Sequence, residues 1–189
     1  AHSFGALIAL GYASKYPLNV NGIVLMNPVE PGKRFSGATA TRQSAAQSEQ
    51  DIIELERLKA SEGFQARDPA TVSQAYRISL RGMFRDRELV DELELNFSVR
   101  TAQNGQEVAR LLGDDLETID WWSKLSEIEV PTLVVHGRYD IPPVAMSRAL
   151  ADVLPFGSLV VLESGHFPYV EDQVGLASTL VRFLAELPR

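Results

Sequence analysis

Ala1-His2-Ser3-Phe4-Gly5 opens the chain and leads directly into the apolar stretch Ala6-Leu7-Ile8-Ala9-Leu10. A serine with a small residue two positions away on each side suits a sharp turn from a strand into a helix, because the tight backbone leaves room only for small neighbours. Such a turn would project the hydroxyl of Ser3 away from the backbone, as a nucleophile requires. The alternative is a turn of small residues that opens an ordinary helix.

The composition is that of an acidic globular protein. The 189 residues, 45% hydrophobic and 23% charged, suffice for one sizeable domain or a core with a subdomain. The formal net charge of −7 argues against nucleic acid or an anionic membrane as a partner, and no apolar run approaches the roughly 20 residues of a membrane span. The lack of cysteine excludes disulfides, thiol catalysis and cysteine-ligated metal. We expect a cytoplasmic location.

Three apolar runs predict buried strands, and helical patterns alternate with them. The runs are residues 20–27, 131–136 and 158–163, and helices are expected at residues 6–13, 143–154 and 174–187. The first helix should end near Pro17, since proline disfavours helical geometry at the preceding residue. Strands that alternate with helices imply parallel crossovers with helices packed on the sheet. Residues 1–29 and 128–189 are therefore predicted to form an α/β core.

Residues 30–127 differ from this core because they are polar, charged and helical in pattern. Apolar residues recur at helical spacing at Ile52, Leu55 and Leu58, at Val72, Ala75, Leu80 and Met83, and at Leu89, Leu93 and Phe97. Gly63, Gly82, Gly105 and Gly113 would separate the helices. We interpret the segment as an all-α insertion of several helices that forms a cap.

A serine nucleophile needs a base within hydrogen-bond reach and an acid that orients the base. The chain offers three histidines. His2 adjoins the serine, but successive residues at a sharp turn point in different directions, so we expect it to pack locally. His136 ends a buried strand, which favours a structural role. His166 follows the last strand, where open α/β sheets place their sites, and is the candidate base.

Asp140 is the candidate acid because it follows the penultimate strand in a turn bounded by Pro142. The alternative is a helix N-cap, which aspartate also favours before prolines. Ser3, Asp140 and His166 follow one another in the order expected for a serine hydrolase built on a parallel sheet. We therefore interpret these three residues as a catalytic triad.

These stretches resemble the matching parts of α/β-hydrolases that carry a helical cap. The resemblance covers residues 1–29 and 128–189, including Val130-Pro131-Thr132-Leu133-Val134-Val135-His136-Gly137 and Ser164-Gly165-His166-Phe167-Pro168. It implies that Ser3 attacks an acyl carbonyl while His166 takes its proton and Asp140 fixes the imidazole tautomer; a water activated by His166 then hydrolyses the acyl-enzyme. The backbone N–H of Phe4 would bind the oxyanion. The serine argues against the haloalkane dehalogenase and epoxide hydrolase branches, whose nucleophile is an aspartate.

In that fold a strand delivers the nucleophile and an oxyanion loop lies further upstream. Neither stands before Ser3 in this sequence, so we expect the chain to be the C-terminal part of an enzyme whose first strands are missing. The strand at residues 20–27 would then have an unpaired edge. Loss of one oxyanion donor alone lowers rates by about 10²–10³. We expect these residues to hydrolyse little by themselves.

The cap is similar in layout to that of proline iminopeptidases in Glu92–Val99, Asn104–Glu107 and Ile119–Trp122. The resemblance implies that Glu94 and Glu107 bind the free α-amino group of a substrate. The alternative is that both are solvated surface residues. Trp121 and Trp122 would line an acyl or proline pocket, or else anchor the cap on the core.

No P-loop, dinucleotide fingerprint or metal-ligand cluster is recognisable, so no cofactor or metal is expected. The preferred function is a serine hydrolase (EC 3) of the proline iminopeptidase type, acting on a small ester, amide or short peptide. A carboxylesterase or a C–C bond hydrolase of the same fold is the first alternative. A non-catalytic binding protein built on the fold is the second, which the intact Ser3, Asp140 and His166 argue against.

Overall fold

A three-stranded parallel sheet lies at the centre of the computed structural model, which describes residues 1–118 and 120–187. β1 (Ile23–Met26), β2 (Thr132–Gly137) and β3 (Gly157–Leu162) lie in that order across the sheet. Met26 pairs with Val135, and Val135 pairs with Val160. The three strands predicted from the apolar runs are confirmed, although β1 covers only Ile23–Met26 of the expected residues 20–27 and follows the 3₁₀ turn η1 (Pro17–Asn19) after three residues outside regular structure.

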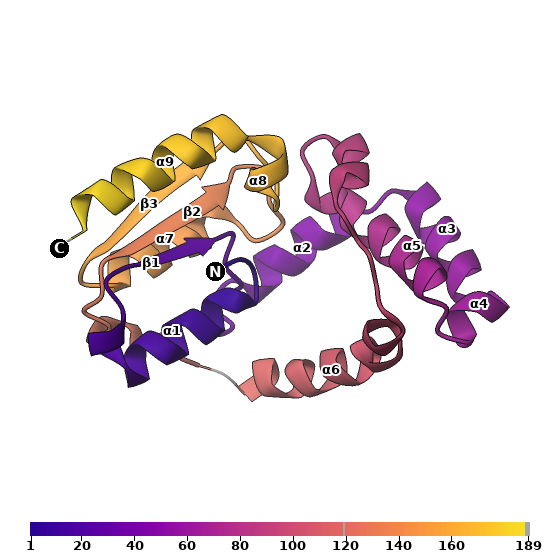
Figure 1. Cartoon of the computed structure of the whole chain (residues 1–189), viewed down its shortest axis with the longest axis horizontal. Coiled ribbons are helices and arrows are strands. Elements are labelled where there is room, and N and C mark those ends of the chain that lie inside the picture. Colours follow the sequence, from indigo (N-terminus) through magenta and orange to yellow (C-terminus); the bar gives the residue numbers. More distant parts are fainter. Residues whose placement is uncertain (119, 188–189) are drawn as a thin grey trace.

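Helices cover both faces of the sheet. Side chains alternate along β2, so apolar residues point to each face and both faces must be covered. Val134 packs with α1 (Gly5–Lys15) and α7 (Val144–Val153) on one face, through residues such as Leu10 and Leu150. Leu133 and Val135 point to the other face and pack on α9 (Gln173–Glu186). Figure 1 shows α9 on one side of the strands and α1 and α7 on the other. The predicted α/β architecture is therefore observed.

The segment between β1 and β2 is helical, as predicted; we call residues 30–127 the helical segment. It contains α2 (Ser36–Ala46), α3 (Glu49–Lys59), α4 (Glu62–Gln65), α5 (Pro69–Leu80), η2 (Arg81–Met83), η3 (Arg87–Glu92), α6 (Val99–Thr118) and η4 (Leu125–Glu127). Local chemistry explains several helix starts. Ser48 forms a capping box with Asp51 at the start of α3, and Asp68 caps α5. In Figure 1, α3, α4 and α5 lie away from the sheet, with α2 between.

Two details of the helical segment differ from the sequence-based expectation. The spacing of Leu89, Leu93 and Phe97 predicts a helix, but the structure has the 3₁₀ turns of η3 followed by extended chain. Here Leu89 and Leu93 pack in a small cluster with Phe84 rather than along a helix face. Gly105 and Gly113 do not separate helices; both lie inside α6. A glycine inside a helix costs only about 1 kcal/mol, which the rest of a long helix can outweigh.

This small cluster joins the helical segment to the core. Phe84, Val90 and Leu93 of the helical segment pack against Phe167, which precedes the short helix α8 (Pro168–Glu171) of the core. The rings of Phe84 and Phe167 are stacked with centroids 4.6 Å apart. In the part of the chain that the structure describes, no helix has both the length and the apolar character that crossing a membrane requires.

Candidate active site

Ser3 lies at the turn between an extended N-terminal stretch and α1. Its backbone φ is 53°, in the left-handed region that non-glycine residues rarely adopt. The N–H of Ser3 donates to the carbonyl of Met26 at 3.0 Å, and His2 forms a parallel bridge with Met26 beside β1. A Cβ on Gly5 would lie 3.8 Å from that of Ala1, so the two small residues face each other across the turn. Ser3 thus has the strained backbone expected of a displayed nucleophile.

Asp140 and His166 meet at the carboxyl ends of β2 and β3. His166 Nδ1 lies 3.0 Å from Asp140 Oδ1 and 2.9 Å from Oδ2. Asp140 is fully buried and His166 is 6% exposed. Because a carboxylate only accepts hydrogen bonds, Nδ1 carries the proton and Nε2 is left as a proton acceptor. No hydrogen bond joins the Ser3 hydroxyl to the His166 imidazole, whose side-chain hydrogen bonds within the described residues are those with Asp140.

The carboxylate of Asp140 has two further donors, neither of which was predicted from the sequence. The N–H of Ile141 donates to Oδ1 at 2.7 Å. Asn27 Nδ2 donates to Oδ2 at 2.6 Å and to the carbonyl of Gly165 at 3.1 Å, so this fully buried amide touches both the acid and the loop of His166. From α2, the Arg42 guanidinium donates to the backbone carbonyls of Asp140 and Ile141.

The backbone of Gly165 and His166 is held at all four of its polar groups. Gly165 N–H donates to the Glu171 carboxylate at 2.9 Å, and its carbonyl accepts from Asn27. His166 N–H donates to the carbonyl of Met83 at 2.7 Å, and its carbonyl accepts from His2 Nε2 at 2.7 Å. The partners come from three different parts of the chain. These four hydrogen bonds fix the backbone that carries the imidazole.

The two other histidines, His2 and His136, pack against and bond to neighbouring residues. The His2 ring lies 4.7 Å from that of His166 and also contacts Phe167 and Tyr169. Burial, and then the neighbouring His166, lower the pKa of His2, which favours its neutral form. His136 is fully buried and bonds through Nε2 to the Pro142 carbonyl and through Nδ1 to Ser147. These contacts agree with the local packing expected for His2 and the structural role expected for His136.

Phe4, the predicted oxyanion donor, stands at the N-cap of α1. The N–H groups of Gly5 and Ala6 donate to the carbonyls of His2 and Ser3. The N–H of Phe4 has no acceptor among the described residues, as is usual for the first amides of a helix. It is therefore available to a bound anion.

The four predicted substrate-binding residues lie in the helical segment, and among the described residues no hydrogen bond, ion pair or ring contact joins any of them to Asp140 or His166. Glu94 and Glu107 are exposed, and Glu107 pairs with Arg110 at 2.9 Å.

Both tryptophans contact the start of the core. The Trp121 ring lies over Gly11 of α1, where an added Cβ would be 2.7 Å from it. Trp122 is 2% exposed and belongs to the core cluster that includes Leu10; its ring also contacts Phe35 and lies 4.5 Å from the Arg34 guanidinium, both in the helical segment. These contacts fit the alternative in which the tryptophans anchor the helical segment on the core.

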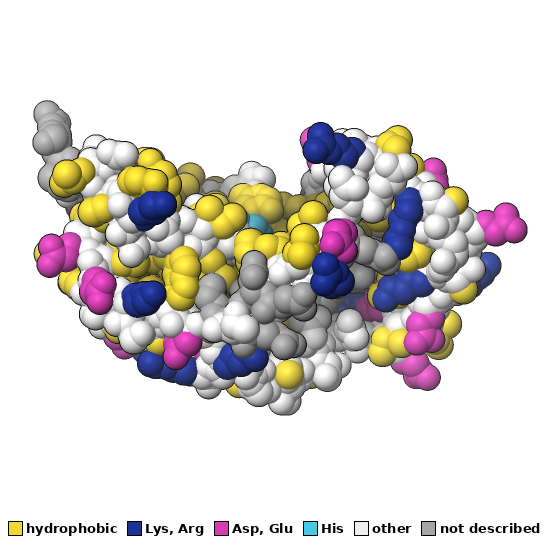
Figure 2. Space-filling model, turned by 90° about the horizontal axis from the view of Figure 1, so that it is seen from below, with side chains coloured by type: hydrophobic (Ala, Val, Ile, Leu, Met, Phe, Trp, Pro, Cys, Tyr) yellow, Lys and Arg dark blue, Asp and Glu magenta, His cyan; other side chains and the backbone are white. Residues whose placement is uncertain are grey.

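The described part of the chain has several surface hollows. One, of about 360 Å³, lies beside the loop after β1 and is lined by Val29, Glu30, Gly32, Ser36, Thr39, Ala40, Gln43 and Pro142. In Figure 2 a histidine side chain is visible among hydrophobic side chains. No group of three or more His, Asp or Glu side chains that could hold a metal ion occurs in the described residues.

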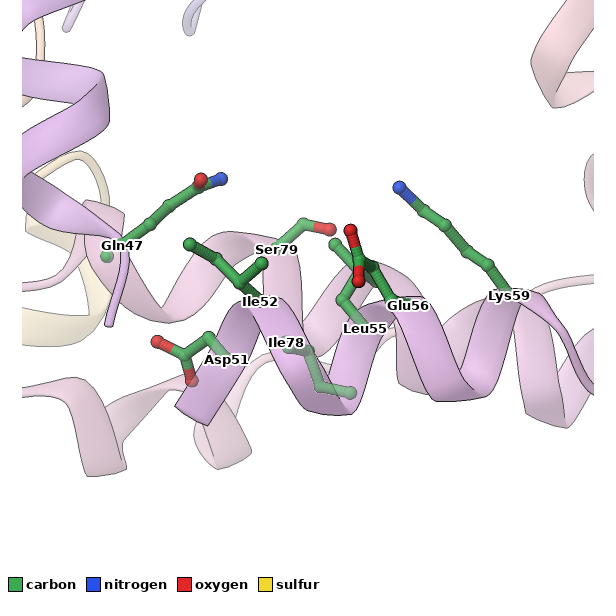
Figure 3. A pocket seen from close by; sticks show the side chains of 9 residues that line it. Gln47, Asp51, Ile52, Leu55, Glu56, Lys59, Ile78 and Ser79 are labelled. Carbon is green, nitrogen blue, oxygen red and sulfur yellow. The ribbon is translucent and has the colours of Figure 1, made fainter. Parts of the chain in front are cut away.

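Another hollow, of about 200 Å³, lies between α3 and α5, away from the Asp140 and His166 pair. Gln47 and Lys59 point towards its mouth and Ile52 and Leu55 line it (Figure 3). The Asp51 carboxylate at its end is already bound by Ser48, Arg81 and Arg87. Among the described residues, the buried side-chain polar atoms without a partner are Asn27 Oδ1 and Trp122 Nε1, and neither lines this groove. We assign it no ligand.

The parallel sheet covered by helices, with a serine at a strand-to-helix turn, defines an α/β hydrolase fold. The family model described as alpha/beta hydrolase fold matches residues 1–173, so the chain belongs to this family. It is 26% identical over 188 residues to the AB hydrolase superfamily protein YclE of Bacillus subtilis (strain 168), covering 90% of this chain and 62% of that protein.

Two solved structures share the fold. An alpha/beta fold family hydrolase from Bacillus anthracis str. Sterne is 21% identical, with a TM-score of 0.66 over 96% of this chain and 65% of that one. A thermophilic esterase from Thermogutta terrifontis is 22% identical, with a TM-score of 0.64 over 98% of this chain and 63% of that one. The chain spans less than two thirds of the length of each of these three proteins.

Proposed function

We propose that the chain supplies the nucleophile, base and acid of a serine hydrolase that cleaves a small ester. Ser3 is the nucleophile, His166 the base and Asp140 the acid that orients it. The observation that carries the proposal is the buried Asp140 carboxylate on His166 Nδ1, which leaves Nε2 as the acceptor. A serine with positive φ at the start of α1 supports the role of Ser3.

The proposed reaction proceeds through an acyl-enzyme. Ser3 Oγ attacks the carbonyl carbon while its proton passes to His166 Nε2, and the Phe4 N–H stabilises the negative oxygen. Collapse of the tetrahedral intermediate expels the alcohol, which takes the proton from His166. A water then gives a proton to His166 as it attacks the acyl carbon, and Ser3 leaves with that proton. The product is a carboxylic acid, and the enzyme returns to its first state.

We propose further that residues 30–127 act as a cap and that a strand lies beside β1 on the side away from β2. Ala1 supports this strand, because its backbone nitrogen donates to the Val24 carbonyl at 2.7 Å and its carbonyl accepts from Met26 N–H at 2.8 Å. The lengths of the relatives agree with a longer enzyme. The 189 residues alone should then hydrolyse esters far more slowly than the full-length enzyme; equal turnover would contradict this.

An aminopeptidase of the proline iminopeptidase type is the second subclass of the same proposal, with Glu94 and Glu107 holding the substrate amine. The exposure of both carboxylates and the pairing of Glu107 with Arg110 favour the esterase. In an aminopeptidase, Glu94→Gln or Glu107→Gln would raise KM for free-amine substrates and leave amine-blocked esters unchanged. Equal effects on both substrates would exclude the amine-binding role.

Labelling of the full-length protein with a fluorophosphonate probe tests the proposal directly. We expect one adduct on Ser3, lost in Ser3→Ala and strongly slowed in His166→Gln. Hydrolysis of an aromatic ester should follow the same order across the variants. A folded wild-type protein without a Ser3 adduct would instead be a non-catalytic binding protein on this fold. A labelled enzyme that cleaves carbon–carbon bonds but not esters would belong to the C–C bond hydrolases.

A further inference from the structure

Glu171, five residues after His166, has a carboxylate that contacts two separate segments of the chain. Its Oε1 accepts a hydrogen bond from Gly165 N–H at 2.9 Å, and its Oε2 accepts one from Arg85 N–H at 2.8 Å. One of these two donors therefore belongs to the loop of His166 and the other to the helical segment.

The two segments approach each other closely at this point. His166 N–H donates to the Met83 carbonyl at 2.7 Å. A Cβ on Gly165 would lie 2.2 Å from the same carbonyl oxygen, so no side chain fits there. Phe84 stacks on Phe167 beside these contacts. The helical segment thus lies against the backbone that carries the imidazole.

The chemistry of this junction requires a carboxylate. Two oxygens accept from N–H groups on opposite sides, whereas a glutamine offers one acceptor and would turn its NH₂ group towards the other N–H. The carboxylate is about half-buried: burial raises the pKa of Glu171, and the surrounding N–H groups act in the opposite direction. The negative charge is balanced by backbone dipoles from both segments.

We infer that Glu171 is a positioning residue that ties the loop of His166 to residues 83–86 of the helical segment, and so keeps the base aligned on Asp140. The inference rests on the proposed function. It makes the cap part of the catalytic geometry: a displacement of residues 83–86 moves Gly165 through Glu171 and moves His166 through Met83.

The test compares full-length wild type with Glu171→Gln. Labelling of Ser3 by the fluorophosphonate and kcat for an ester should both fall roughly 10–100-fold, as for a displacement of about 1 Å, with KM little changed. Hydrogen exchange should accelerate in peptides that cover residues 83–86 and 164–167 together. Glu186→Gln removes an exposed carboxylate from α9 and is the matched control. Arg85→Ala removes the guanidinium but keeps the N–H, and should retain the exchange pattern at Gly165.

The outcomes separate this inference from the proposed function. If wild type is not labelled, the proposed function fails, and the exchange measurement still decides whether Glu171 joins the two segments. If wild type is labelled and Glu171→Gln reacts equally fast, or exchange changes in neither segment, the inference alone is wrong. Should Glu171→Gln not fold, Glu171→Asp takes its place, because a side chain one methylene shorter cannot reach both N–H groups. Normal labelling of that variant would overturn the inference.

Discussion

A methyl group at Gly137 should displace the base without unfolding the protein. Gly137 ends β2 directly beside the loop of His166, and a Cβ there would lie 1.9 Å from the Gly165 carbonyl oxygen and 2.5 Å from that of Ser164. Real Cβ atoms essentially never approach within 3.0 Å, so backbone must move by about 1 Å. The distances of 2.9 and 3.0 Å between His166 and Asp140 would then exceed hydrogen-bond range.

The expected loss follows from that displacement. A misplacement of about 1 Å lowers turnover about 10²-fold, and overpacking of this kind costs about 1–3 kcal/mol in the free energy of unfolding. Ester hydrolysis by full-length Gly137→Ala gives kcat/KM, and urea unfolding gives the stability. The control is Gly37→Ala in α2, where an added Cβ meets no atom within 4 Å. A folded Gly137→Ala enzyme with the kcat/KM of wild type would refute the reasoning.

Three further predictions concern other buried polar groups. Asn27→Ala removes the hydrogen-bond donor to Asp140 and to Gly165, so kcat should fall at least about tenfold. Asn19→Ala, which changes an exposed asparagine, is the control, and equal kcat values for the two variants would contradict the prediction. Burial would raise the pKa of Asp51, but hydrogen bonds from Ser48, Arg81 and Arg87 outweigh it and lower the pKa to about 2. Its contribution, about 2 kcal/mol, is therefore present above about pH 4 and lost as the pH falls towards 2. Urea unfolding of Asp51→Asn should show that loss at pH 7 and a smaller difference from wild type near pH 2; a constant difference would exclude it. Ser147→Ala leaves His136 Nδ1 without its partner and should lower the free energy of unfolding by about 1–3 kcal/mol, with kcat unchanged. A loss of turnover in the folded variant would instead show that His136 has a catalytic role.

The sequence predicts the core well because its elements are encoded locally. β2 and β3 are apolar runs that end in Gly137 and Leu162, and α9 shows a continuous helical spacing. Local periodicity predicts η3 less well, because its leucines pack in a cluster that includes Phe167 from the other end of the chain. Contacts made by residues far apart in sequence decide that segment.

The candidate site was found from residues whose position relative to a strand is visible in the sequence. Asp140 and His166 each follow a strand, and their pairing follows from the parallel order of β2 and β3. Asn27 offers the same signal, since it follows β1 directly and β1 neighbours β2. Glu171 offers none, because its partners are backbone N–H groups that no side-chain pattern records.

Backbone strain occurs at two polar residues of the candidate site. Among the described residues, Ser3, Asn27 and Arg67 are the non-glycine residues with positive φ. Glycine would adopt this geometry at less cost, so a side chain retained there has a reason to be kept. Arg67 lies at the junction of α4 and α5, where its guanidinium is over the Phe64 ring. Ser3 and Asn27 follow two neighbouring extended stretches, which are joined by the bridge between His2 and Met26. Ser3 offers a hydroxyl, and Asn27 donates a hydrogen bond to Asp140. Two strained polar residues at adjacent strand ends are therefore better evidence for an active site than either residue alone.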